Sequence, residues 1–340
     1  MDMKAAIQAV ASRRDLPPGV MRKVMKQVLN GEATPAQIGA LLIGLRMKGE
    51  TVDELTAAAE VMRTFAHGIQ IEHPHLVDTC GTGGDGAHIF NVSTACAFVA
   101  AAGGAVVAKH GNRSISSRCG SADLLEAAGA RLDLPHALLE ACLHELGVAF
   151  LFAPAHHPAM AHVAAPRREV GGRSLFNLLG PLSNPAGARR QVVGVFDAAW
   201  LMPVAQALSA LGSQHVMVVH AEDGLDEISV ASPTDVVELR RGELSRHCID
   251  PEAFGIRKAS LSDLRVDGPE DSLRIVRDVF AGRPGPARDI VALNAGAALY
   301  VAGIVPTLAA GVARADQLIA EGRAGARFDA FIRFTQHAHP

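Results

Sequence analysis

LVDTCGTGGDG, residues 76–86, is a short apolar run that leads directly into a turn with four glycines. The apolar run predicts a buried β-strand, and a helical pattern begins after Asn91. Glycines between a strand and a helix let backbone N–H groups approach an anion closely, and the helix N-terminus adds the positive end of its dipole. This segment therefore predicts an α/β fold with a phosphate-binding loop.

Similar apolar runs recur after this loop and alternate with helical patterns. They lie at residues 105–108, 191–196, 215–220 and 236–239, and one intervening helix is expected over 201–211. Strands that alternate with helices are typical of βαβ units, whose strands run parallel. We expect a large α/β domain, residues 73–340, with a mainly parallel central sheet covered by helices.

The N-terminal region carries helical signals only. TPAQ (34–37) and TVDE (51–54) have the spacing of capping boxes, and apolar residues recur at helical spacing after each. Residues 1–72 are therefore predicted to form a small all-helical domain. Part of residues 165–187, which contain a Gly-Gly pair and FNLLGPLSNP, has the composition of a hinge and is expected to pack on this domain.

Composition excludes several classes of protein. The 340 residues include 32 Lys and Arg against 35 Asp and Glu, a formal net charge of −3, and 49% are hydrophobic, as in a globular chain that does not coat nucleic acid. The longest stretch of low polarity, residues 95–108, is shorter than the roughly 18 apolar residues of a membrane span, and the N-terminus lacks the apolar core of a secretion signal. Five cysteines without a Cys-x-x-Cys pair argue against a disulfide framework and a structural zinc site. We expect a cytoplasmic protein that binds neither nucleic acid nor membrane.

The glycine-rich loop alone fits two kinds of nucleotide site. Its spacing matches G-x-G-x-x-G, but a dinucleotide site also needs an acidic residue about 20 residues further on, at the end of the next strand. The chain has KHGNR there, residues 109–113, and no Gly-Lys-Ser/Thr follows the glycines as in a P-loop NTPase. Two cations at the carboxyl end of a strand indicate that this edge of the sheet binds an anion.

Hydroxyl-bearing side chains surround the predicted loop. Ser93 and Thr94 stand at the start of the next helix, where they either cap the helix or reach a phosphate or a phosphate-bound metal. Further hydroxyl groups follow KHGNR, at Ser114, Ser116, Ser117 and Ser121.

Asp226 and Glu227 are adjacent carboxylates in a loop after the strand at 215–220. They form either a solvated turn or a Mg²⁺ site, since Mg²⁺ takes one or two carboxylates together with substrate phosphates. Near the predicted hinge, Arg167 and Arg168 form either a solvated helix face or a clamp for a carboxylate, which a guanidinium binds through two hydrogen bonds. Together these residues fit a phosphorylated, metal-bound substrate and a smaller substrate with a carboxylate.

Eight segments carry a resemblance to a known family. They are GEATPAQIGALLIGLRMKGET (31–51), DTCGTGGDG (78–86), FNVSTA (90–95), KHGNRSISS (109–117), GSAD (120–123), FLFAPAHHPAM (150–160), RSLFNLLGPLSNP (173–185) and DGLDEIS (223–229). In this order, over nearly the whole chain, they resemble the anthranilate phosphoribosyltransferases of tryptophan biosynthesis. The resemblance implies a pentosyltransferase that moves the phosphoribosyl group of 5-phosphoribosyl 1-diphosphate to the amine of anthranilate and releases diphosphate.

The resemblance also implies roles for single residues. The phosphoribosyl donor would be bound by Gly81, Gly84, Asp85, Asn91, Val92, Ser93, Thr94, Lys109, His110, Gly111, Asn112, Arg113, Ser114, Ile115, Ser116, Ser117 and Ser121. Mg²⁺, as two ions with the diphosphate, would be bound by Ser93, Asp226 and Glu227. Anthranilate would contact Gly81, Asn112 and Arg167, with His110 and Pro181 beside its path. The family further implies a homodimer formed through the small helical domain, and the sequence offers neither a covalent nucleophile nor a clear general base.

Ile89 departs from the family's pattern, because the family commonly has a threonine there whose hydroxyl helps to bind the donor. Loss of that hydrogen bond, worth about 1 kcal/mol, would weaken donor binding several-fold.

Two other functions compete with the transferase. A nucleoside phosphorylase of the same fold would differ after the Lys-His pair, and a non-catalytic relative that binds nucleic acid would have a basic surface and altered metal carboxylates. The slightly acidic chain, which keeps Asp226 and Glu227, favours the transferase.

Overall fold

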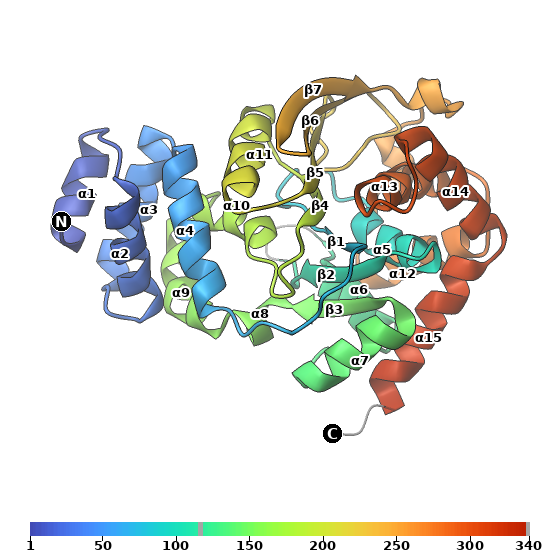
Figure 1. Cartoon of the computed structure of the whole chain (residues 1–340), viewed down its shortest axis with the longest axis horizontal. Helices are drawn as coiled ribbons and strands as arrows, with labels where there is room; N and C mark the ends of the chain where they lie inside the picture. Colours follow the sequence, from blue (N-terminus) through green and yellow to red (C-terminus); the bar gives the residue numbers. More distant parts are fainter. Residues whose placement is uncertain (115–117, 338–340) are drawn as a thin grey trace.

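The structure, a computed structural model, describes residues 1–114 and 118–337. Its two parts lie side by side: a group of N-terminal helices on the left of Figure 1 and a sheet covered by helices on the right. The helices of the first part are α1 (Met3–Ala11), α2 (Pro18–Leu29), α3 (Pro35–Lys48) and α4 (Val52–Phe65). None of the helices in the described part of the chain has the length and apolar character needed to span a bilayer.

Both predicted capping boxes are confirmed. The backbone N–H of Gln37 donates to Thr34 Oγ1 at 3.3 Å, and the Gln37 side chain accepts from the Thr34 N–H at 3.0 Å. Thr51 and Glu54 make the same pair of bonds at the start of α4. Because these bonds satisfy N–H groups that a helix end leaves free, the sequence fixes where α3 and α4 begin.

Glu54 also joins three segments of the helical part. Its side chain is fully buried, bonds Lys48 Nζ at 2.8 Å and accepts from the backbone N–H of Leu16 at 2.8 Å. Lys48 lies at the end of α3 and is 3% exposed, and it bonds Asp15 as well. A buried charge is tolerated only when it is paired and hydrogen-bonded, and here the pairing ties α3, α4 and the α1–α2 connection together.

The larger part contains seven strands and the remaining helices of the described chain. The strands are β1 (Leu76–Thr79), β2 (Val106–Gly111), β3 (Val148–Phe152), β4 (Arg190–Gly194), β5 (His215–Ala221), β6 (Thr234–Arg240) and β7 (Glu243–Ile249). The helices are α5 (Val92–Ala102), α6 (Ser121–Ala127), α7 (His136–Leu146), α8 (Ala153–His156), α9 (Ala161–Val170), α10 (Leu175–Leu182), α11 (Leu201–Ala210), α12 (Pro269–Phe280), α13 (Pro286–Val301), α14 (Leu308–Ala320) and α15 (Arg323–His337).

The strands form one sheet in the order β3-β2-β1-β4-β5-β6-β7. The first five run parallel, which confirms the mainly parallel sheet, while β6 and β7 are antiparallel. The run at 236–239 belongs to β6, so it does not continue the parallel series, because the short connection from β5 contains no crossover helix. Two strands, β3 and β7, escape prediction: β3 follows α7 directly, and β7 is an exposed edge strand with a polar sequence.

Strand order places the candidate site. From β1 the chain continues to β2 and β3 on one side of the sheet and later to β4 and β5 on the other. A ligand-binding crevice forms in such sheets where the order reverses, outside the carboxyl ends of the strands. The glycine-rich loop follows β1 at that position.

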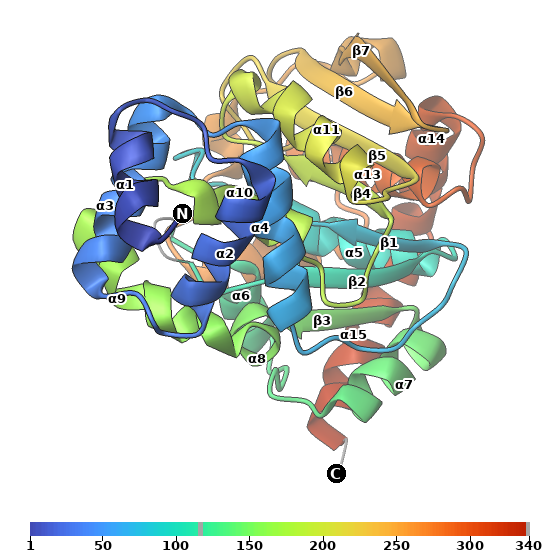
Figure 2. The same cartoon turned by 60° about the vertical axis from the view of Figure 1, so that its left-hand side comes forward.

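The two faces of the sheet belong to different hydrophobic cores. Met217 and Val219 face a core built with α5, α13 and α15, whereas Val216 and Val218 face a core shared with the N-terminal helices. In the second core α10 and α11 lie between α4 and the strands (Figure 2). Helices α9 and α10, which contain most of residues 165–187, contact α3 and thereby join the two parts.

Candidate active site

Glycine is required where the loop after β1 turns. Gly83 and Gly84 have φ of +63° and +81°, which side chains rarely tolerate. A Cβ on Gly81 would lie 2.6 Å from Asp226 Oδ2. The loop is tied to β4, since the Thr82 N–H donates to the Gly194 carbonyl at 2.9 Å. The glycines thus allow the loop to sit directly against the acidic segment that follows β5.

The two carboxylates among the predicted metal ligands, those of Asp226 and Glu227, lie against backbone N–H groups. Asp226 Oδ2 accepts from the Gly83 N–H at 2.7 Å, and Glu227 Oε1 accepts from the Ser93 N–H at 3.2 Å. Gly194 makes this approach possible, because a Cβ there would lie 1.5 Å from the Asp226 carbonyl oxygen. The structure therefore brings Asp226, Glu227 and Ser93 together, and both acidic residues are partly buried.

Negative charge is concentrated at this point. Burial, with the neighbouring carboxylates of Asp85 and Glu227, raises the pKa of Asp226 well above its usual range. Burial also raises the pKa of Glu227 to about 7, although Lys109 acts in the opposite direction. Carboxylates in this arrangement are unfavourable without a cation, and hard oxygen ligands suit Mg²⁺. The residues present fit such an ion.

Lys109 connects three of the predicted donor-binding segments. It is 3% exposed, and its Nζ donates to the Thr79 carbonyl at 2.6 Å and to Ser93 Oγ at 3.2 Å. Neither Ser93 nor Thr94 is the N-cap residue of α5: that residue is Asn91, whose side chain makes no capping bond. The Glu227 carboxylate instead accepts from the Ser93 N–H in the first turn. Thr94 Oγ1 is buried and makes no hydrogen bond to any described residue, so this hydroxyl has bonding capacity left for a ligand.

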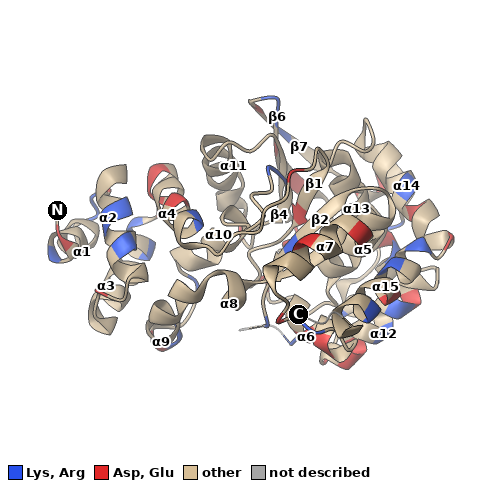
Figure 3. Ribbon diagram, turned by 60° about the horizontal axis from the view of Figure 1, so that its bottom comes forward, with Lys and Arg blue, Asp and Glu red and all other residues tan. Residues whose placement is uncertain are grey.

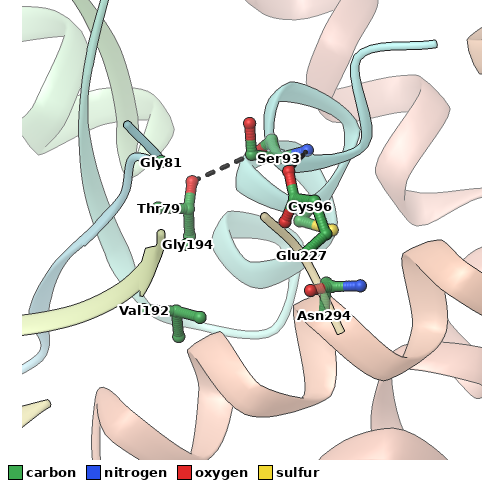
Figure 4. A pocket seen from close by; sticks show the side chains of 8 residues that line it. All are labelled: Thr79, Gly81, Ser93, Cys96, Val192, Gly194, Glu227 and Asn294. Atoms are coloured by element: carbon green, nitrogen blue, oxygen red, sulfur yellow. Dashed lines mark hydrogen bonds between the residues drawn. The ribbon is translucent and has the colours of Figure 1, made fainter. Parts of the chain in front are cut away.

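A small cavity of about 10 Å³, the room of one water molecule, lies behind these residues. Figure 4 shows its lining, which comes from β1, β4, α5, α13 and the acidic loop. The hydroxyl of Thr79 donates to the Ser93 carbonyl across it at 3.1 Å. The lining residues are Thr79, Gly81, Ser93, Cys96, Val192, Gly194, Glu227 and Asn294.

His110 and Pro181 meet at the carboxyl end of α10. His110 is 4% exposed, its Nδ1 lies 3.2 Å from the Gly180 carbonyl, and its ring lies 5.1 Å from the ring of His157. The Pro181 carbonyl accepts from Gln191 Nε2 at 2.7 Å. Burial lowers the pKa of His110 to about 3, so the imidazole is neutral at pH 7. His110 Nε2 has no partner among the described residues.

The other predicted residues lie at the rim or support it. Asn112 and Arg113 are exposed, and Arg113 is paired with Glu126. Gly111 has Phe150 where a Cβ would stand, 2.7 Å away. The Ser114 N–H donates to Asp123 Oδ2 at 2.9 Å. Ser121 begins α6, Val92 is buried at the start of α5, and Ile115, Ser116 and Ser117 lie outside the described residues.

Arg167 comes from the joining helices. It lies on α9, its guanidinium is 5.4 Å from the centre of the Phe176 ring, and burial lowers its pKa. Arg168 beside it is exposed. A desolvated guanidinium favours a carboxylate partner.

Three residues support the site, and two of them, Arg173 and Asp78, have no predicted role. Arg173 donates to the Gly84 carbonyl, and its guanidinium lies 4.2 Å above the Phe196 ring. Asp78 is buried in β1 and accepts from the His110 N–H at 3.1 Å and from Asn184 at 2.7 Å. Asn91 itself is held, since its Oδ1 accepts from the Ser272 hydroxyl at 2.7 Å. Of these residues, only Asp78 could have been found from the sequence, because an acidic residue inside an apolar strand is unusual.

Comparison with known proteins defines the class of protein first. Residues 4–66 match the helical bundle domain, and residues 73–325 the a/b domain, of a glycosyl transferase family. A two-part fold of this kind, with a phosphate loop facing paired carboxylates, is that of a glycosyl transferase.

Similar proteins narrow the class to one family. Anthranilate phosphoribosyltransferases of Alkalilimnicola ehrlichii and Thioalkalivibrio sulfidiphilus are 60% and 57% identical over 336 and 335 residues, covering at least 98% of each chain. The crystal structure of the enzyme from Thermus thermophilus superposes with a TM-score of 0.92 at 43% identity, over 97% of this chain and 99% of that one. The Saccharomyces cerevisiae enzyme in complex with PRPP and Mg shares the fold, with a TM-score of 0.90 at 24% identity over 99% and 98% of the two chains. The chain belongs to the anthranilate phosphoribosyltransferase family and is a pentosyltransferase.

The neutral state of His110 predicts how stability depends on pH. The pKa of a histidine in the unfolded chain is near 6.5, whereas burial lowers that of His110 to about 3, so only the unfolded state takes up a proton between these values. The contribution of His110 to the free energy of unfolding is fully present above pH 6.5 and is lost as the pH falls toward 3. In urea unfolding between pH 6 and pH 4, we expect His110→Asn to reduce the slope of unfolding free energy against pH by about 1.4 kcal/mol per unit. Equal slopes in parent and variant would show that His110 is protonated in the fold.

Proposed function

We propose that this chain transfers the phosphoribosyl group of 5-phosphoribosyl 1-diphosphate to the amine of anthranilate, giving N-(5-phosphoribosyl)anthranilate and diphosphate in tryptophan biosynthesis. The observation that carries the proposal is the placement of Asp226 and Glu227 against the glycine-rich loop and the first turn of α5. Family membership supplies the substrates. The complex of the yeast enzyme with PRPP and Mg agrees with this assignment.

The phosphoribosyl donor is assigned to the carboxyl edge of the sheet. The loop of Gly81, Gly84 and Asp85 and the α5 residues from Asn91 to Thr94 offer N–H and hydroxyl groups to its phosphates. The residues from Lys109 to Ser117, with Ser121, are assigned to the donor as well, although Ile115, Ser116 and Ser117 lie outside the described residues. Lys109 adds a buried positive charge.

Ser93, Asp226 and Glu227 are assigned to Mg²⁺, as two ions held together with the diphosphate. When bound, Mg²⁺ neutralises charge that grows on the departing diphosphate. The carboxylates of this chain provide the negative groups that hold the cation, and the N–H groups of Gly83 and Ser93 fix their orientation. The raised pKa of each carboxyl reflects a site that is balanced only with positive charge present.

Anthranilate is assigned to the junction with the α9–α10 layer. Arg167 pairs with its carboxylate, Gly81 and Asn112 contact it near the donor, and His110 and Pro181 line its path. Because the amine of anthranilate is neutral and nucleophilic at pH 7, the chain needs no covalent nucleophile. Its task is to hold the amine in line with the bond that breaks and to stabilise the leaving group.

A homodimer through the helical part is also proposed. Ile43 and Met47 on α3 are 37% and 68% exposed, and the only charged residues of α3 lie in its last turn. Figure 3 shows α3 mostly in tan, with few charges along it. Exposed apolar residues one helical turn apart form a stripe that a second copy would bury.

All five cysteines are free, which supports action in the reducing cytoplasm.

The activity itself is tested by anthranilate fluorescence in a mixture of protein, 5-phosphoribosyl 1-diphosphate and Mg²⁺. We expect a loss of signal that requires all three and stops with EDTA.

The variant Asp226→Asn with Glu227→Gln should lower turnover by about a hundredfold or more, since several kcal/mol of charge stabilisation are removed. Its thermal midpoint should not fall, because the variant relieves repulsion. Glu222→Gln, an exposed acid on the same loop, is the matched control. Unchanged Mg²⁺-dependent turnover in the double variant contradicts the metal assignment.

Arg167→Ala tests the acceptor site. A hydrogen bond between charged groups is worth about 2 kcal/mol, so the KM for anthranilate should rise by about tenfold or more. The KM for the donor should stay constant. Arg168→Ala, the exposed neighbour, should leave both constants unchanged. A selective effect of Arg167→Ala on the donor would place this arginine in the other substrate's site.

Ile43→Glu with Met47→Glu tests the dimer. Light scattering after size exclusion should show a dimer for the parent and a monomer for this variant, because two charges would be buried in the interface. Met202→Glu on α11, where the methionine is 38% exposed, should remain dimeric. A parent that runs as a monomer, or a variant that stays dimeric, places the interface elsewhere.

A further inference from the structure

Asn294 is a buried polar residue in the middle of an apolar helix. It lies on α13, where every residue from Ile290 to Val301 is buried, and it is 3% exposed. A buried amide is costly unless its donors and acceptor are bonded, so a residue of this kind has a specific partner. The partner lies in the acidic loop.

The Asn294 side chain bonds both backbone groups of one residue. Its Oδ1 accepts from the Ile228 N–H at 2.9 Å, and its Nδ2 donates to the Ile228 carbonyl at 2.8 Å. The second hydrogen of Nδ2 goes to the Ile290 carbonyl of its own helix at 2.9 Å. The amide therefore holds Ile228 as a neighbouring strand would hold a residue in a sheet.

Ile228 directly follows the two carboxylates. It is fully buried in a loop between β5 and β6, so no ladder of the sheet pairs its backbone. Asn294, from α13, and Glu227, from the acidic loop, also line the same small cavity (Figure 4). A shift of the Ile228 backbone would be carried directly to the Glu227 side chain, and with it to the bond between Glu227 and the Ser93 N–H.

We propose that Asn294 is a positioning residue for the carboxylates that bind Mg²⁺. By fixing the backbone of Ile228 it sets the carboxylate of Glu227 against the start of α5, where the diphosphate is assigned. The inference rests on the proposed role of Asp226 and Glu227 as Mg²⁺ ligands. Residues that orient metal ligands from behind commonly influence affinity for the metal as strongly as some ligands do.

Tyr300 provides a matched control on the same helix. Its hydroxyl is buried, donates to Glu238 Oε1 at 2.8 Å and accepts from Arg240 at 2.9 Å, near the other end of α13. Tyr300→Phe thus removes two hydrogen bonds made by α13 without touching the acidic loop. A role in stability alone would give Asn294 and Tyr300 variants the same phenotype.

The experiment compares Asn294→Ala, Asn294→Leu and Tyr300→Phe with the parent enzyme. Leu fills most of the volume of the amide, so it provides a second variant if Ala does not fold. The readouts are the Mg²⁺ concentration for half-maximal turnover and the binding of Mn²⁺ in the presence of 5-phosphoribosyl 1-diphosphate, followed by electron paramagnetic resonance. We expect the Asn294 variants to need about tenfold more Mg²⁺ and to bind Mn²⁺ correspondingly more weakly, with an unchanged KM for anthranilate. Tyr300→Phe should lower the thermal midpoint and leave both metal readouts unchanged.

Equal metal readouts in the Asn294 variants and the parent, or an equal rise in Tyr300→Phe, would overturn the proposal. The double variant of Asp226 and Glu227 separates this failure from that of the proposed function, because it alone reports whether those carboxylates bind the metal. Hydrogen exchange in the parent protein needs no variant: the Ile228 N–H should be protected like those of β5. Rapid exchange at Ile228 would equally reject the inference.

Discussion

The carboxylates of Asp226 and Glu227 are held against backbone N–H groups at the edge of the sheet, and much of the fold serves to tolerate that charge. Gly81 and Gly194 lack side chains where the acidic loop passes, and the start of α5 faces Glu227. Burial raises the pKa of both carboxyl groups, so their ionised forms are unfavourable without a nearby positive charge. In the proposed function a cation would supply that charge, and binding of the metal would thereby be coupled to binding of the phosphorylated donor.

The opposite side of the site depends on neutral polar contacts. His110 and Gln191 face carbonyl groups at the carboxyl end of α10, and Asn184 joins Asp78 to the segment that follows. Burial raises the pKa of Asp78 to about 6 and lowers that of His110 to about 3. These bonds anchor the layer that carries Arg167 to the strands that carry the donor loop. Contacts with the sheet, as well as helix packing, therefore set the position of the layer that carries Arg167.

Local chemistry explains what could be predicted from the sequence. A capping box is complete within four residues, and a glycine-rich loop is recognised by its own spacing. The starts of α3 and α4 and the glycine-rich loop could therefore be predicted from the sequence. Asn294 was not, because its partner lies 66 residues earlier and the apolar residues around it indicate only a buried helix. The strand β7 has an edge position that demands no apolar alternation, and its polar sequence resembles a loop. Ser93 illustrates a different limit: its position at the start of a helix is typical of a cap, but its own N–H is bonded by Glu227, 134 residues later in the chain.

Division of labour between the two parts of the chain follows from this geometry. The groups assigned to the donor come from the ends of strands, the loops after them and the first turns of α5 and α6, whereas Arg167 and Pro181 come from helices that also pack on the N-terminal bundle. A reaction without a covalent intermediate depends on bringing two bound molecules into line, and small displacements reduce its rate strongly. Because the second hydrophobic core continues from the bundle through α10 to the inner face of β4 and β5, packing of the bundle fixes the acceptor groups relative to the donor groups. In the proposed reaction, the small helical part would therefore act through the rigidity of that shared core.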